Sequence, residues 1–144
     1  MSDREGYRIV RRNEEGDTVL VVEVDMPPEP VTADDRRAYV ETFLEREPEE
    51  RRLAEELVSY AYSHKPLIDQ LFLDDERNLW VRRRLDEGKT PEYTIFRPDG
   101  SLAGSVQLAF RPSFVPPRVR DGRLYAIVAD DFGVQQWVRV DLGG

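Results

Sequence analysis

The side chains best suited to metal or acid–base chemistry are few in this chain. His64 is the only histidine and there is no cysteine, so a catalytic triad or a histidine-based metal site would depend on one imidazole. His64 is expected at the C-terminal end of a helix, where the helix dipole favours a cation. We therefore interpret His64 as a structural residue.

Two acidic clusters could offer oxygen ligands to a hard cation. Asp74-Asp75-Glu76 and Asp130-Asp131 lack the glycine and the distal glutamate of an EF-hand loop. Because Asp and Asn favour turns through bonds to their own backbone, we interpret both clusters as hairpin turns. The sequence thus predicts no metal site, no cofactor site and no catalytic residues.

Two further segments invite comparison with anion-binding sites. Gly88-Lys89-Thr90 is similar to the end of a phosphate-binding loop, but the first glycine of that motif would fall on Arg83. The second segment is Arg82-Arg83-Arg84. Because alternate residues of a strand point to opposite faces, only Arg82 and Arg84 could converge on one ligand. We interpret these arginines as solvated charges on an outer strand, where they discourage unwanted pairing.

Four aromatic residues lie at repeated strand positions: Trp80, Tyr93, Tyr125 and Trp137. Large rings at such positions usually supply buried area. We expect them to pack between sheets and not to stack on a ligand.

The composition narrows the classes of partner. The 144 residues include 21 basic and 29 acidic side chains, a net charge of -8, and the longest run of basic residues is three, Arg82 to Arg84. Binding to nucleic acid or anionic membranes therefore has no electrostatic basis. The apolar runs are too short for a membrane-spanning helix, so no membrane insertion is expected. Residues 1–6 lack a secretory signal, which predicts a cytoplasmic location as written. If the natural protein extends upstream of Met1, an extracytoplasmic location is the alternative.

The first third of the chain predicts a hairpin and then two helices. Strands are expected over 7–12 and 18–24, and the prolines of 26–30 end the pairing. Thr32 and Asp35 match a capping box, so a helix should begin near Ala33. A second helix is expected to carry Pro48 in its first turn and to place its apolar stripe on one face. That stripe consists of Leu53, Leu57 and Ala61 beside Ala54, Val58 and Tyr62.

From Pro66 onward the pattern is one of repeated hairpins. Four strands, over 68–73, 79–82, 93–97 and 102–108, predict one antiparallel sheet. Three more strands are expected over 119–120, 124–129 and 134–142. Leu79-Trp80-Val81 and Leu124-Tyr125-Ala126 lie 45 positions apart, which is close to the length of a four-stranded propeller blade.

The chain resembles the C-terminal part of bacterial six-bladed β-propeller proteins of the TolB-like or NHL-like type. The runs that carry the resemblance are 65–82, 93–100 and 123–134. It implies a mainly β fold with a two-helix insertion, a partial propeller of about two to three antiparallel blades in a single domain, 1–144. Within it, 7–24 would be two outer strands of an earlier blade, 32–63 the helical insertion, 66–108 a four-stranded blade and 115–142 a three-stranded blade.

An incomplete ring would expose sheet faces and unpaired strand edges. We therefore expect self-association or a protein partner through open blade edges, or else helices folded over one open sheet face. The expected function is a non-catalytic binding or protein-interaction module. The alternative is a metal-dependent hydrolase or lyase of propeller type, completed by oligomerisation. A sheet that continues unbroken from Leu108 to Val119 would contradict the propeller interpretation.

Overall fold

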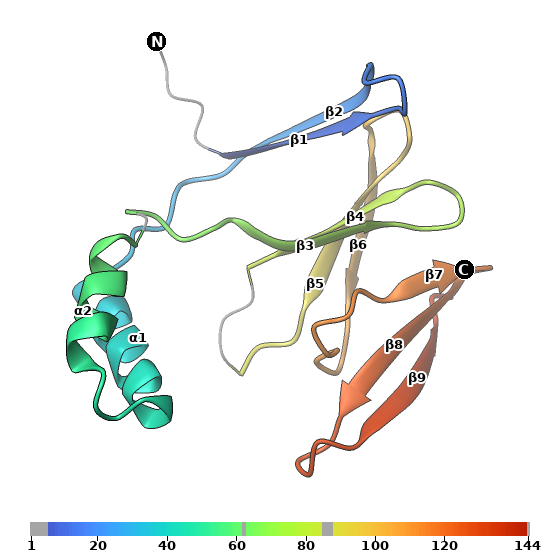
Figure 1. Cartoon of the computed structure of the whole chain (residues 1–144). Helices are drawn as coiled ribbons and strands as arrows, with labels where there is room; N and C mark the ends of the chain where they lie inside the picture. Colours follow the sequence, from blue (N-terminus) through green and yellow to red (C-terminus); the bar gives the residue numbers. More distant parts are fainter. Residues whose placement is uncertain (1–5, 62, 85–87, 144) are drawn as a thin grey trace. The chain divides into compact units, whose positions relative to one another are not determined.

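The computed structural model describes residues 6–61, 63–84 and 88–143 (Figure 1). The chain divides into two compact units: a helical unit, 1–6 with 25–66, and a sheet unit, 7–24 with 67–144. The expectation of a mainly β chain with two helices is confirmed. The helices are α1 (Ala33–Arg46) and α2 (Arg51–Ser59). The strands are β1 (Gly6–Arg12), β2 (Thr18–Asp25), β3 (Ile68–Leu73), β4 (Leu79–Arg83), β5 (Glu92–Phe96), β6 (Leu102–Gln107), β7 (Arg118–Arg120), β8 (Arg123–Ala129) and β9 (Gln135–Asp141).

Helix α1 begins as the sequence predicts. The Thr32 hydroxyl accepts the Asp35 N–H at 3.1 Å, and the Asp35 carboxylate accepts the Thr32 N–H at 2.8 Å. These bonds satisfy two of the N–H groups that a helix leaves unpaired at its start. They also lower the pKa of Asp35, with the Thr32 bonds as the main cause and Lys65 as a smaller one.

Helix α2 is shorter than predicted. Pro48 is not in its first turn, because Glu47 to Glu50 form a separate turn closed by a 3.1 Å backbone bond. Proline suits the second position of such a turn. The helix ends at Ser59, whose hydroxyl donates to the Glu56 carbonyl at 2.6 Å and so competes with the helical ladder. Ala61 therefore lies beyond the helix, and Tyr62 falls outside the described residues.

The predicted apolar stripe of the helices is only partly covered. Ala54 is buried, whereas Leu53 and Leu57 are about two-fifths exposed, and α1 contains no buried residue. Within the described residues the two helices pack mainly against each other, so part of the stripe has no neighbour to cover it. Neither helix in the described ranges has the length and apolar character that a bilayer span demands.

The strands form three separate antiparallel sheets. The first is β1-β2, the second β3-β4-β5-β6 and the third β7-β8-β9. The strand counts of two, four and three match the prediction, and the chain breaks the pairing between Leu108 and Val119 as expected. Among the strands that the structure describes, each pairs only with its neighbours in the sequence.

Four of the hairpins share one five-residue loop. In each, the first residue donates its N–H to the fifth carbonyl, and the fourth donates to the first carbonyl. Asn13, Asp74, Arg97 and Asp130 are the first residues. The fourth residue has positive φ, and it is glycine at Gly16, Gly100 and Gly133 but arginine at Arg77, with φ 65°. Glycine is favoured there because it has no Cβ to clash with the following carbonyl.

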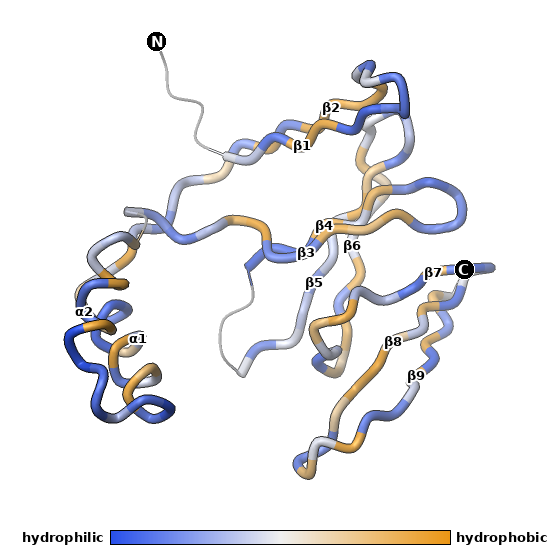
Figure 2. The backbone as a smooth tube through the Cα atoms, in the orientation of Figure 1, coloured by the Kyte–Doolittle hydropathy of each residue, from blue (hydrophilic) through white to orange (hydrophobic). Residues whose placement is uncertain are grey.

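The middle sheet contributes buried side chains from both of its faces. Figure 1 shows its four strands in the sheet unit, β3 to β6. One face presents Leu79 and Val81 to the first sheet. The other presents Trp80 and Tyr93 to the third sheet, where Leu124 is fully buried. We call these the first core and the second core. Strand alternation places odd and even residues of β4 in different cores. In Figure 2 β8 is apolar along most of its length.

Candidate binding surfaces

His64 does not occupy the helix end at which we expected it. It lies five residues after Ser59 and forms an isolated bridge with Pro30, and its Nδ1 is 3.0 Å from the Ser63 hydroxyl. Nearby, the Lys65 ammonium contacts Glu29 at 2.8 Å and Asp35 at 3.3 Å. Glu29 is the main cause of the raised pKa of Lys65. Within the described residues, no group of three His, Cys, Asp or Glu side chains could hold a metal ion.

The acidic clusters form hairpin turns, as predicted. Asp74 Oδ1 accepts the N–H groups of Glu76 at 3.0 Å and Asn78 at 2.8 Å, and its Oδ2 accepts from Asn78 Nδ2 at 2.9 Å and from the Trp80 indole at 3.0 Å. Asp130 Oδ1 accepts two backbone N–H groups in the same way. These carboxylate oxygens therefore organise the turns.

The prediction for Arg82 is wrong. Strand β4 is an interior strand of its sheet, and the Arg82 side chain is only 13% exposed, with Nε 2.6 Å from Asp69. A β-bulge between Ile68 and Gln70 leaves Asp69 without a register partner on β4. Arg82 is thus held by a structural ion pair and is not a solvated edge charge. Residues 88–90 lie in the loop before β5 and form no strand-to-helix junction.

The four aromatic residues divide into two groups. Trp80 and Tyr93 are buried between the second and third sheets, with ring centroids 5.8 Å apart, and the Tyr93 hydroxyl donates to Gln70 at 2.7 Å. Burial raises the pKa of Tyr93. Trp137, in contrast, is 70% exposed, so the prediction that it packs between sheets is wrong. Tyr125 is half-buried. Both lie on the third sheet, on the side that no other described sheet covers.

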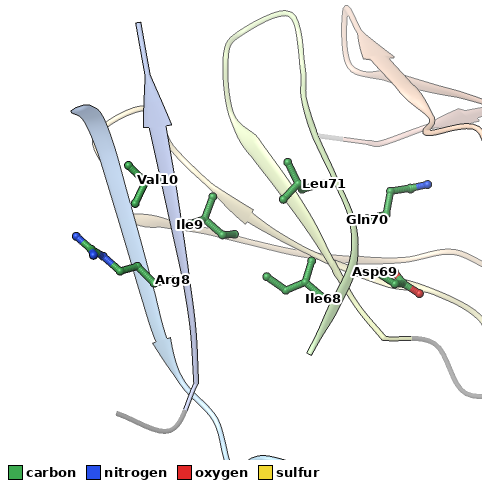
Figure 3. Close-up of a pocket in the computed structure, with 7 residues that line it drawn as sticks. All are labelled: Arg8, Ile9, Val10, Ile68, Asp69, Gln70 and Leu71. Carbon is green, nitrogen blue, oxygen red and sulfur yellow. The ribbon is translucent and has the colours of Figure 1, made fainter. Parts of the chain in front are cut away.

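A groove of about 530 Å³ opens between β1 and β3 (Figure 3). Arg8, Ile9 and Val10 line it from β1, and residues 68–71 line it from β3. Figure 3 shows Ile9, Ile68 and Leu71 pointing into the space between the two strands. Both strands are at the edge of their sheets, so each has backbone groups that no neighbouring strand pairs.

The groove borders an uncovered part of the middle sheet, which includes Leu71 from the groove lining and Leu73 beyond it. Leu71 and Leu73 are the register partners of Val81 and Leu79, so all four lie on the face that packs against the first sheet. Val81 and Leu79 are buried, whereas Leu71 is 49% and Leu73 44% exposed. The first sheet therefore stops at β1, short of covering β3.

Sequence reasoning missed this groove. The burial of Leu71 depends on how far the first sheet extends, which the residues of β3 do not encode. The available signal was that the N-terminal sheet has two strands and the sheet beside it has four.

No protein-family model matches the chain, and no curated protein or solved structure shows significant similarity to it.

Proposed function

We propose that the chain is a non-catalytic protein-interaction module that binds an extended polypeptide segment in the groove between β1 and β3. The observation that carries the proposal is the half-exposure of Leu71 and Leu73 on a face where their register partners, Val81 and Leu79, are buried. A strand added to the free edge of β1 would lie over these leucines and bury them. Strand addition of this kind obtains affinity from backbone bonds and specificity from alternate side chains.

The edge of β1 is better suited to the added strand than the edge of β3. The bulge at Asp69 interrupts the regular spacing of β3, and bulges protect edges against pairing. A segment on β1 would also continue the first core, because Ile9 already packs there. Every second residue of the bound segment would then face Leu71 and the middle sheet.

We further propose that the three sheets are consecutive blades of a partial propeller, as the resemblance to TolB-like and NHL-like proteins implies. Face-to-face stacking on both sides of the middle sheet supports this proposal. The two segments that lie 45 positions apart in the sequence also support it. They fall on β4 and β8, which are the second strands of successive sheets. In this arrangement the bound segment would occupy the position of a missing strand.

Selection from a random peptide library tests the groove. We expect the wild-type chain to enrich peptides that alternate β-branched or aromatic residues with polar ones. Leu71→Lys should remove this enrichment because a charge would be buried beneath the added strand. Leu102→Lys is the matched control: Leu102 is also an exposed leucine of the middle sheet, but it lies on β6 at the opposite edge.

Equal enrichment by wild type and Leu71→Lys would refute the groove as the site. Sedimentation velocity over a concentration series identifies the source of the segment. A rise in mass that Leu71→Lys abolishes would show that a second copy supplies it. A constant mass, together with selected peptides that protect the β1 amides from hydrogen exchange, would show a separate partner.

A further inference from the structure

The third sheet leaves one face uncovered within the described residues. Leu124 and Ala126 point into the second core, so Tyr125 and Ile127 lie on the opposite face of β8. Their register partners on β9, Arg139 and Trp137, lie on that face with them. We call this surface the Arg–Trp face. It comprises Arg118, Arg120, Arg123, Tyr125, Ile127, Trp137, Arg139 and Asp141.

The register orders these side chains in rows across the sheet. Arg118, Tyr125 and Arg139 form a central row of two guanidinium groups on either side of a phenol. Ile127 and Trp137 form the row on one side of it, and both are apolar. The face therefore has an apolar end next to a cationic centre.

The row on the other side of the centre adds to its charge. Arg120, Arg123 and Asp141 align there. Asp141 is shared, with oxygen–nitrogen distances of 3.4 Å to Arg123 and 3.8 Å to Arg139, and all three side chains are more than half exposed. Such exposed pairs contribute little stability. Asp121, in the turn between β7 and β8, also lies 3.7 Å from Arg120. The four arginines are thus opposed by two aspartates, although the whole chain has a net charge of -8.

This face corresponds to one that is covered elsewhere in the molecule. Trp80 and Tyr125 are at equivalent positions of the 45-residue repeat. Trp80 is 2% exposed because the third sheet packs over it. Tyr125 points to the same side of its own sheet, where the described residues provide no covering sheet.

We propose that the Arg–Trp face binds an acidic protein segment that carries an aromatic or aliphatic side chain beside its carboxylates. Carboxylates would accept paired bonds from Arg118 and Arg139, and the apolar side chain would pack on Trp137 and Ile127. Arginine and tryptophan are the residues that most often dominate binding energy in protein interfaces.

Charge decides against two other occupants. A second copy that presented its own Arg–Trp face would bring arginines against arginines, which is repulsive. A nucleic acid would meet Asp141 among the arginines and a strongly acidic protein behind them. A short acidic segment brings only a few negative charges toward the acidic chain, and its apolar side chain can pack on Ile127 and Trp137.

Two-dimensional NMR of the indole N–H groups tests the proposal on the whole chain. The two tryptophans give two signals, and Trp137→Phe assigns them. The probe is a short synthetic peptide that alternates glutamate with phenylalanine. We expect it to shift the Trp137 signal and leave the Trp80 signal in place, because Trp80 is buried. A peptide with glutamine in place of glutamate should bind at least about tenfold more weakly.

Charge-reversal variants complete the test. Arg118→Glu with Arg139→Glu should weaken peptide binding at least about tenfold. Arg51→Glu with Arg52→Glu, which changes the net charge equally on α2, should weaken it far less. Equal loss in both double variants, no shift of the Trp137 signal, or a larger shift with a thymidine oligonucleotide would each overturn the proposal. The unmoved Trp80 signal verifies that each variant is folded. None of these variants touches Leu71, so the groove can fail or succeed separately.

Discussion

Removal of the Asp74 carboxylate should destabilise the sheet unit more than removal of its counterpart Asp130. Both carboxylates accept two backbone N–H groups of the same loop, but only Asp74 also accepts the Trp80 indole and the Asn78 amide. The two loops share the same backbone bonding pattern. The pair of variants Asp74→Ala and Asp130→Ala therefore separates the bonds made to the core from those made within a turn.

The expected magnitudes follow from what each variant leaves unpaired. In Asp130→Ala the freed N–H groups are at an exposed loop, where water replaces the carboxylate, so the cost is about 1 kcal/mol. In Asp74→Ala the Trp80 indole N–H is left without a partner on a ring that is 2% exposed. An unpaired buried donor costs about 1–3 kcal/mol, which brings the expected total to about 2–4 kcal/mol.

Urea unfolding in a Trp137→Phe background measures the difference, because emission then comes from Trp80 alone. Asp74→Asn serves as an intermediate variant: one amide oxygen can still accept backbone N–H groups, but the amide nitrogen cannot accept the indole. If Asp74→Ala and Asp130→Ala lose equal free energy of unfolding, the indole bond contributes nothing and the reasoning is wrong.

Three other predictions concern the loops, the second core and the helix start. Arg77→Gly should stabilise the sheet unit by up to about 1 kcal/mol in urea unfolding, since it relieves a positive φ, and Gly133→Ala should destabilise it by a similar amount. Because burial raises the pKa of Tyr93, its contribution to stability is present below pH about 10 and is lost as the pH rises through its folded-state pKa. Tyr93→Phe should flatten the pH dependence of the unfolding free energy in that alkaline range, and an unchanged profile would contradict this. Because the pKa of Asp35 is lowered, its contribution is present above pH about 4 and is lost as the pH falls further; an NMR titration should show a higher pKa for Asp35 in Thr32→Val.

The turns and the strands could be predicted from the sequence because their signals are local. Asp and Gly at fixed positions predict the acidic loops, and Thr32 and Asp35 predict the capping box. Each depends on contacts within five residues. The same holds for the break between the second and third sheets.

The outcomes that could not be predicted depend on distant residues. Arg82 is shielded because a bulge in β3 brings Asp69 beneath it, and a bulge leaves no clear mark in the sequence. Trp137 is exposed because no described sheet follows the third one, although its residue type is typical of a core. For the same reason the candidate surfaces were missed: a face becomes a site only when the chain fails to cover it.

Pairing of each strand with its sequence neighbours has a consequence for how the sheet unit unfolds. All ladders close over short loops, so little chain entropy is lost in forming any one sheet. Contacts between residues that are distant in the sequence form mainly where one sheet packs on the next. The sheet unit should therefore behave as a short linear array, in which intrinsic and nearest-neighbour energies add. Damage to the first core would loosen β1 and β2 and leave the contact between the second and third sheets intact.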